Sequence, residues 1–319
     1  MPLRQCAAPR CDRRQPTPPE PSSAPRTVRV GTSGWSYPDW EGRFYPAKKP
    51  RGFDELAYHA RYFDCVEVNS SFYRPPTARA VASWLRRTPP EFEFTFKLYQ
   101  RFTHERQRPW TPAEVEEYRR GIEPAREAGR LGAVLVQFPW SYRADDSGFK
   151  HLDAVRRDFG DLPLVVEVRH VSWTSERAVR FLKDAGLGFA DIDQPLSRSG
   201  VPPMTLVTSP VGYVRLHGRN REAWFSKDAG RDARYDYLYR EDELEEWIGR
   251  IREIARQSEK TYIFTNNHYR GQAPANALQI LSKLRSRPVP VPAPLLQTYP
   301  FLGSIAAEGL PPGEQGELF

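Results

Sequence analysis

Seven charged or titratable side chains stand at or near the ends of short apolar runs in the sequence. They are Glu67, Lys97, Glu167, Arg169, Asp191, Arg215 and His217. The two glutamates could act as an acid/base pair, as in sugar hydrolysis. The three cations would suit a phosphate or a carboxylate, because arginine can bind either group with two N–H donors. The histidine is the side chain that titrates near neutral pH.

Neutral polar and aromatic residues accompany these charges. They are Ser33, Trp35, Asn69, Gln137, Asn266 and Asn267. Alternation along a strand does not decide which of the two adjacent asparagines points inward. The acids and His217 could also hold a divalent metal. Barrel metallohydrolases usually show several inward histidines, however, and only His217 and His268 qualify here, so the sequence leaves the cofactor open.

An alternative interpretation of the same charges needs no ligand. Three acids face three bases, and they could neutralise one another as a buried lattice of ion pairs. A buried polar group without a partner costs on the order of 2–7 kcal/mol, so these groups must be either paired or solvated. We prefer a ligand pocket, because the polar groups follow strands of a fold whose active sites form at the strand ends.

The elements that would position these groups are eight runs rich in β-branched and aromatic residues. They span 28–32, 65–69, 92–97, 133–138, 164–169, 188–192, 212–217 and 261–266. Helical patterns lie near 53–63, 77–87, 112–129, 148–159, 175–185, 240–257 and 273–285, and none falls between 195 and 210. Such alternation predicts an α/β protein with a single (β/α)8 TIM-like barrel. A doubly wound open sheet is the alternative, but no strand is followed by a GxGxxG loop.

Composition and charge divide the 319 residues into three parts. Residues 1–27 are rich in Arg and Pro without an apolar run, which predicts a disordered leader and no signal peptide. Residues 28–285 would form the barrel, and residues 286–319 a Pro-rich tail whose first part packs across the barrel bottom. No stretch approaches the roughly 20 apolar residues of a membrane helix. Three cysteines give no disulfide framework, so we expect a reducing cytoplasm. The net charge of +7 permits a phosphate-bearing partner.

Aromatic and basic loops are expected around the barrel mouth. The rim would be formed by the segment 31–46 and by the later residues Phe72, Tyr73, Trp140, Trp173, Trp224 and Phe225, and it would suit stacking on bases or sugars. The long connection 218–247 carries Arg219, Arg221, Lys227, Arg231 and Arg234 near the pocket and could be either a solvated loop or a mobile lid that recruits an anion.

The last five residues, QGELF, resemble the Gln-x-x-Leu-Phe peptide by which bacterial polymerases and repair proteins bind the sliding clamp. Gln315, Leu318 and Phe319 would enter a hydrophobic groove as a short linear motif. A plain amphipathic tail is the alternative. A functional peptide would place the protein in DNA replication or repair.

Ordered segments across residues 28–285 resemble the YecE-like family, domain of unknown function 72. The matching segments are VGTSGWSYPDWEGRFYP, FDCVEVNSSFYRPP, FEFTFKLYQRFTH, LGAVLVQFP, LPLVVEVRHVSW, YVRLHGR and FTNNHYRGQAPANA. The resemblance implies a TIM-like barrel with a pocket at the strand carboxyl ends and no defined reaction. It carries over the candidate site Ser33, Trp35, Glu67, Asn69, Lys97, Gln137, Glu167, Arg169, Asp191, Arg215, His217 and Asn267. The Arg/Pro-rich leader departs from the usual start of the family.

Three hypotheses for function follow. The first is an enzyme acting on DNA or another phosphate-bearing substrate, such as a hydrolase in DNA maintenance; barrel nucleases of the endonuclease IV group are its fold-level analogy. The second is a carbohydrate-active hydrolase or isomerase using Glu67 and Glu167. The third is a non-catalytic module that binds a ligand in the pocket and the clamp through the tail.

Overall fold

Eight parallel strands close into a barrel in chain order in the computed structural model, which describes residues 27–226 and 228–307. The strands are β1 Thr27–Ser33, β2 Cys65–Val68, β3 Glu93–Lys97, β4 Leu131–Gln137, β5 Leu164–Glu167, β6 Gly188–Asp193, β7 Val211–Leu216 and β8 Lys260–Thr265. β8 pairs with β1 over six residues and thereby closes the ring. The predicted (β/α)8 barrel is confirmed, and every predicted strand lies within two residues of an observed one at both ends.

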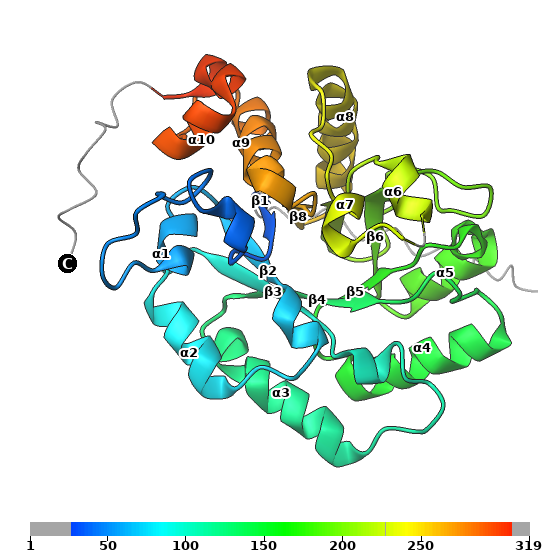
Figure 1. Ribbon diagram of the computed structural model, residues 1–319. Helices are drawn as coiled ribbons and strands as arrows, with labels where there is room; N and C mark the ends of the chain where they lie inside the picture. The colour runs from blue at the N-terminus through cyan, green and yellow to red at the C-terminus, as the bar shows by residue number, and fades with distance from the viewer. Residues whose placement is uncertain (1–26, 227, 308–319) are drawn as a thin grey trace, which may run out of the picture.

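Helices surround the strands on the outside (Figure 1). They are α1 Glu55–His59, α2 Ala78–Arg86, α3 Pro112–Glu127, α4 Asp146–Phe159, α5 Glu176–Asp184, α8 Glu241–Gln257 and α9 Gln272–Arg285. Among these helices, α3 and α5 each begin with a side-chain cap. Thr111 caps α3 in a capping box with Glu114, and the Ser175 hydroxyl accepts the Ala178 N–H at the start of α5.

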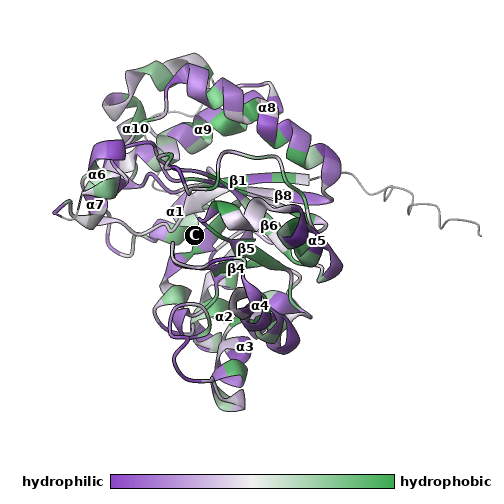
Figure 2. Cartoon of the chain, turned by 90° about the vertical axis from the view of Figure 1, so that its right-hand side faces the viewer, coloured by the Kyte–Doolittle hydropathy of each residue, from purple (hydrophilic) through white to green (hydrophobic). Residues whose placement is uncertain are grey.

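The two connections next to β7 differ from the other strand–helix units. Residues 194–210 join β6 to β7 without a helix, as predicted. The segment after β7 contains two short helices that the sequence analysis did not predict, α6 Arg221–Phe225 and α7 Arg231–Arg234. In Figure 2 both helices project beyond the barrel at the left, which is the side of the molecule that faces the viewer in Figure 1. This segment therefore stands at the rim of the barrel mouth.

Apolar residues form an inner and an outer core. Inside the barrel, Ala133, Leu135, Val165, Ala190 and Ile192 pack with Cys65, Tyr213, Tyr262 and Phe264. Residues of the opposite parity, such as Val134 and Val166, pack outward against the helices. Both faces of each strand are thus buried, as expected for parallel strands covered by helices.

The first part of the C-terminal tail packs beside α9. Residues Ala293–Thr298 form α10, and Pro300–Ile305 form a 3-10 helix, η6. The prediction that this segment crosses the barrel bottom is wrong. Ser286 ends α9 with φ of 51°, which turns the chain back along the helix, and the Tyr299 hydroxyl donates to the carbonyl of Arg270, just after β8. The segment therefore reaches the level of the barrel mouth on the outside of the ring.

None of the helices within the described ranges is both long and apolar enough to cross a membrane.

Candidate active site

The candidate site begins where the apolar interior of the barrel ends. Cys65, Leu135, Val165, Tyr213 and Phe264 belong to the interior cluster. Side chains two positions further along a strand share the same face. The residues two positions further are Glu67, Gln137, Glu167, Arg215 and Asn266. The strands therefore place five of the predicted site residues in one layer at their carboxyl ends.

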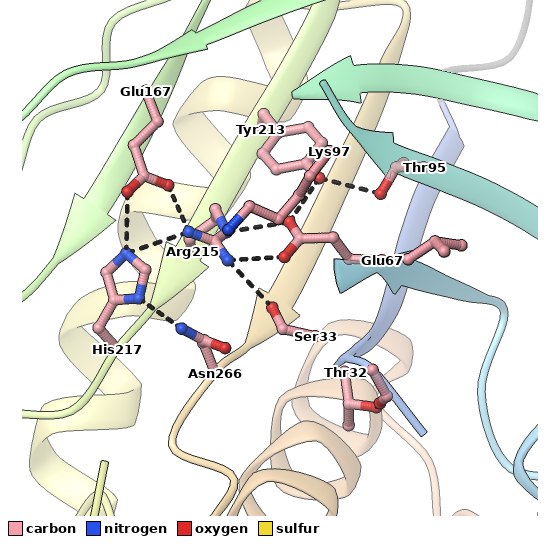
Figure 3. Close-up of polar contacts among 12 residues, drawn as sticks. Thr32, Ser33, Glu67, Thr95, Lys97, Glu167, Tyr213, Arg215, His217 and Asn266 are labelled. Carbon is pink, nitrogen blue, oxygen red and sulfur yellow. Dashed lines mark hydrogen bonds and ion pairs between the residues drawn. The ribbon is translucent and has the colours of Figure 1, made fainter. Parts of the chain in front are cut away.

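Arg215 organises this layer (Figure 3). Its guanidinium donates from Nε and Nη2 to the two Glu67 oxygens at 2.9 and 2.6 Å, and from Nη1 to Oε2 of Glu167. Its Nη2 also lies 3.4 Å from the Ser33 hydroxyl. All three charged side chains are almost fully buried. The layer is thus built around one cation shared by two carboxylates.

The shared arginine decides what the two glutamates can do. The pKa of Glu167 lies well below its usual value although burial opposes this, because Arg215, His217 and Arg169 favour the ionised form. The Glu67 carboxylate also accepts a hydrogen bond from the Tyr213 hydroxyl at 2.8 Å. A general acid must carry a proton near the working pH, which the lowered pKa of Glu167 opposes, and the Glu67 carboxyl is turned toward Arg215 and Tyr213. The arrangement therefore argues against the acid/base pair of a sugar hydrolase.

His217 lies beside this network without reaching the surface. Its Nε2 is 3.5 Å from Oε1 of Glu167, and its Nδ1 is 2.9 Å from the side-chain nitrogen of Asn266. With that asparagine as donor, Nδ1 accepts and Nε2 carries the hydrogen toward Glu167. Burial lowers the pKa of His217 to about 4, so the ring is neutral at pH 7. We infer that His217 positions Glu167, because no part of it is exposed to solvent.

Lys97 differs from the other charged members of the site. It ends β3, where its carbonyl accepts from the hydroxyls of Ser71 and Tyr118. Its half-buried side chain places Nζ 4.5 Å from the centre of the Phe72 ring. Among the described residues, no hydrogen bond or ion pair involves this ammonium. Burial lowers its pKa to about 8, helped by Arg215 and opposed by Glu67 and Glu167.

Arg169 links the buried layer to the surface. Its Nη2 donates to Oε1 of Glu167 at 3.0 Å, and its guanidinium carbon lies 5.4 Å from the centre of the Trp224 ring on α6. Arg169 therefore belongs to the ion-pair network through Nη2, while its guanidinium carbon lies over an aromatic ring at the rim.

Two adjoining hollows cover the barrel mouth. The first, about 580 Å³, has Lys97, Asn69, Gln137, Arg169, Arg215 and Asn266 among its walls, with Trp35. The second, about 570 Å³, is walled by Trp140, Trp224, Phe225, Arg234 and others. Gln137, Arg169 and Tyr235 line both. We treat them together as the mouth cleft. It brings together most of the predicted site residues, while Ser33, Glu67, Glu167 and His217 lie beneath it.

Sequence reasoning missed several residues that line the cleft. They are Gln100, His104 and Tyr235, whereas Tyr37, Phe72 and Tyr73 in the same walls belong to the predicted aromatic rim. Phe72 and Gln100 belong to short 3-10 turns that directly follow β2 and β3, and His104 comes just after the second of these. The signal of Gln100 and His104 in the sequence is their closeness to the end of β3, and no comparable signal marks Tyr235.

Two predicted site residues point elsewhere. Asp191 was expected inside the barrel, but Ala190 and Ile192 take the inward positions of β6. Asp191 faces outward, where one oxygen accepts the Leu206 N–H at 3.0 Å and the other has no hydrogen-bond partner among the described residues. Burial raises its pKa to about 8.

Asn267 also turns away from the cleft. Its amide donates to the Tyr237 carbonyl and to Oδ1 of Asn276, each at 2.8 Å. Asn266 is the inward member of the pair, which settles the choice left open by alternation. Asn267 instead ties the loop after β7 to helix α9.

No group of three or more His, Cys, Asp or Glu side chains within the described ranges is arranged to hold a metal ion. The four residues considered as ligands are separated, because Asp191 lies on the outer face of β6 and Glu67 and Glu167 are turned toward Arg215. These four residues are therefore not arranged to hold a metal ion together. Two further predictions fall on residues that the structure does not describe. These residues are Gln315, Leu318 and Phe319 of the terminal peptide and Lys227 of the connection 218–247.

Comparisons with known proteins agree with this architecture. A Bacillus subtilis protein, UPF0759 protein YunF, is 30% identical over 270 residues, which cover 81% of this chain and 94% of that protein. The Escherichia coli K12 protein YecE, also of UPF0759, is 26% identical over 60% of this chain and 62% of its own length. The crystal structure of a DUF72 family protein from Thermotoga maritima superposes with a TM-score of 0.72 at 35% identity, over 81% of this chain and 99% of that one. The family described as "Protein of unknown function DUF72" matches residues 29–298, so this chain belongs to the DUF72 family.

Proposed function

We propose that the protein is an enzyme that acts on nucleic acid or another phosphate-bearing substrate in the mouth cleft. The observation that carries the proposal is the Lys97 ammonium. It stands in the wall of the cleft without a carboxylate partner among the described residues, next to a buried layer in which the other charges are paired. An anionic group entering the cleft would supply the missing partner.

The aromatic walls favour a substrate with flat rings or sugars beside its phosphate. Phe72 lies under Lys97, Tyr73 beside it is 62% exposed, and Phe225 in the second hollow is 50% exposed. Exposed rings of this kind stack on bases at about 1–3 kcal/mol per base. A nucleotide or an oligonucleotide would use both the cation and the rings.

The residues that line the cleft and those of the buried layer would have different roles. Lys97 and Arg169 would touch the substrate, since both line the cleft. Glu67, Arg215, Glu167 and His217 would fix the orientation of Arg169 and the local charge from below, since they lie in the buried layer. The ion-pair lattice considered as an alternative is thus present in the lower part of the site, and the proposed binding surface lies on top of it.

Equilibrium binding of a fluorescent single-stranded oligonucleotide tests the proposal. We expect Lys97→Met and Arg169→Gln each to weaken binding about tenfold or more, since a charge-assisted hydrogen bond contributes about 1.5–3 kcal/mol. Each should also reduce the salt dependence of log K by about 0.7, the slope per phosphate contact on a single strand. Arg180→Gln is the matched control, because Arg180 lies exposed on α5 in an ion pair with Glu176. Binding that is unchanged in both cleft variants, or equally weakened in the control, would contradict the proposal.

A further inference from the structure

The geometry around Lys97 suits more than the binding of an anion. The backbone of Lys97 is fixed at the end of β3 by the hydroxyls of Ser71 and Tyr118, at 2.8 and 3.1 Å from its carbonyl oxygen. Its Nζ lies over the face of Phe72 at the edge of the first hollow, which has a volume of about 580 Å³. A lysine held in this way presents its nitrogen to the cleft at a defined place.

The charged and titratable groups around Lys97 come from the three strands β2, β5 and β7, from Arg169 just after β5, and from the turn after β3. Glu67 on β2 and Glu167 on β5 would favour its ammonium form, but Arg215 on β7 neutralises both of them directly. Burial, Arg215 and Arg169 instead favour the neutral amine of Lys97. His104, in the turn after β3, is neutral at pH 7, since burial and the charge of Lys97 lower its pKa to about 4. These surroundings therefore shift the equilibrium between the ammonium and the neutral amine of Lys97 toward the neutral amine, compared with a lysine in water.

A neutral amine is the form of lysine that attacks a carbonyl carbon. Nearby cations and a desolvated pocket are the two means by which proteins activate a lysine for this reaction. The described lysines Lys49, Lys260 and Lys283 each form ion pairs with carboxylates, and none of them lines the mouth cleft. Among the described lysines, Lys97 alone combines placement in the cleft with freedom from an anionic partner.

We propose that Lys97 forms an imine with the carbonyl carbon of a phosphorylated sugar, whose phosphate is bound by Arg169 in the same cleft. The proposal rests on the phosphate-binding function proposed above and names the reacting group and the substrate class. The same chemistry is offered by a free sugar phosphate and by the ring-opened sugar of an abasic site in nucleic acid.

The step balances without any further reagent. The lysine nitrogen forms a bond to the carbonyl carbon, and one of its two N–H protons passes to the carbonyl oxygen to give a carbinolamine. The second N–H proton leaves with that oxygen as water, and a C=N bond remains between the substrate and Nζ. A protonated imine withdraws electrons from the neighbouring carbon, which eases cleavage of a C–C or C–O bond next to the former carbonyl.

Reductive trapping of the intact protein tests the inference. The two probes are ribose 5-phosphate and a single-stranded oligonucleotide with one abasic site, each incubated with the protein and sodium cyanoborohydride. Trapping should add the mass of the probe less one oxygen atom, and peptide mapping should place the adduct on Lys97. The rate of trapping should rise with pH and level off above the pKa of Lys97, about 8, because only the neutral amine attacks.

Two variants serve as controls. Lys97→Arg keeps the positive charge but has no amine that can form the imine, so it should bind both probes and lose the adduct. Lys150→Arg, at an exposed position on α4, should trap as well as the wild type. An adduct with the oligonucleotide alone would identify nucleic acid as the source of the sugar, and an adduct with the free sugar phosphate alone would identify a small metabolite.

Several outcomes would overturn the inference. Probe binding without any adduct, or an adduct spread over surface lysines and unaffected by Lys97→Arg, would refute the imine and leave the phosphate-binding function standing. Failure of the wild-type protein to bind either probe would refute both proposals. Mapping of the wild-type adduct decides the matter even where the Lys97→Arg variant does not fold.

Discussion

Arg215 binds both oxygens of Glu67 through two nitrogens, Nε to Oε2 at 2.9 Å and Nη2 to Oε1 at 2.6 Å. Such a two-pronged pair, buried at the end of a barrel, fixes the orientation of both side chains. The third guanidinium nitrogen is bound to Glu167, so the pair also sets the position of the next carboxylate along the layer. Removing the guanidinium would leave two buried anions without their main partner.

The first prediction concerns the stability of this layer. Arg215→Met should lower the free energy of unfolding by about 3–5 kcal/mol, the usual cost of breaking a buried ion pair from one side. Urea titration followed by circular dichroism measures the change. Arg180→Met, which breaks an exposed pair with Glu176, should stay within about 0.5 kcal/mol of the wild type. Equal effects of the two substitutions would mean that the buried network contributes no more than a surface pair.

The second prediction concerns Asp191 and pH. Burial raises its pKa from 3.8 to about 8, so between these values the unfolded chain releases a proton that the folded chain keeps. The stability associated with the protonated carboxyl is therefore complete below pH 3.8 and is lost as pH rises toward about 8.

Asp191→Asn removes this titration while keeping an oxygen for the Leu206 N–H. We expect the urea midpoint to fall less between pH 5 and pH 8 in this variant than in the wild type. Asp184→Asn, at an exposed position on α5, is the control and should leave the pH dependence unchanged. A wild-type midpoint with the same pH dependence as Asp191→Asn would disprove the raised pKa.

The third prediction separates the two hollows of the mouth cleft. Phe225 lines the second hollow and is half exposed, whereas Lys97 lines the first. Phe225→Ala should weaken binding of an oligonucleotide by about 1–3 kcal/mol, the contribution of stacking on one base. Binding of inorganic phosphate should not change, because phosphate has no ring to stack. Isothermal titration of the two ligands makes the comparison, and equal losses for both would show that Phe225 acts through the fold.

Much of this architecture could be predicted because barrel strands repeat a simple pattern. Alternation placed Glu67, Glu167 and Arg215 correctly, since each lies two residues beyond an apolar interior residue. Asp191 shows where the rule fails. Both faces of a parallel barrel strand are buried, so a polar residue near its end does not by itself mark the inner face. In GFADID the inward residues are Ala190 and Ile192, and only pairing with the neighbouring strands reveals it.

The rest of the site depends on contacts that the sequence does not display. Tyr235 reaches the cleft from the segment between α7 and α8, and no periodic pattern marks it. The pKa of Lys97 depends on Arg215, 118 residues away in the chain, and on the fact that Arg215 is itself bound by two glutamates. Residue types predicted which groups could react, and packing decided which of them remain available in the cleft.

The last prediction concerns the C-terminal peptide, which lies beyond the described residues. The sequence QGELF offers a glutamine, a leucine and a phenylalanine with the spacing of a clamp-binding peptide. We propose that Gln315, Leu318 and Phe319 bind the hydrophobic groove of a bacterial sliding clamp, which would bring the mouth cleft to DNA. Surface plasmon resonance with a purified clamp should detect the full chain and lose the signal on deletion of residues 315–319. The same deletion should leave oligonucleotide binding in the cleft unchanged, since the cleft residues are untouched. A clamp signal that survives the deletion would assign the contact to another surface, and a full-length chain without any signal would end the clamp proposal while the cleft chemistry stands.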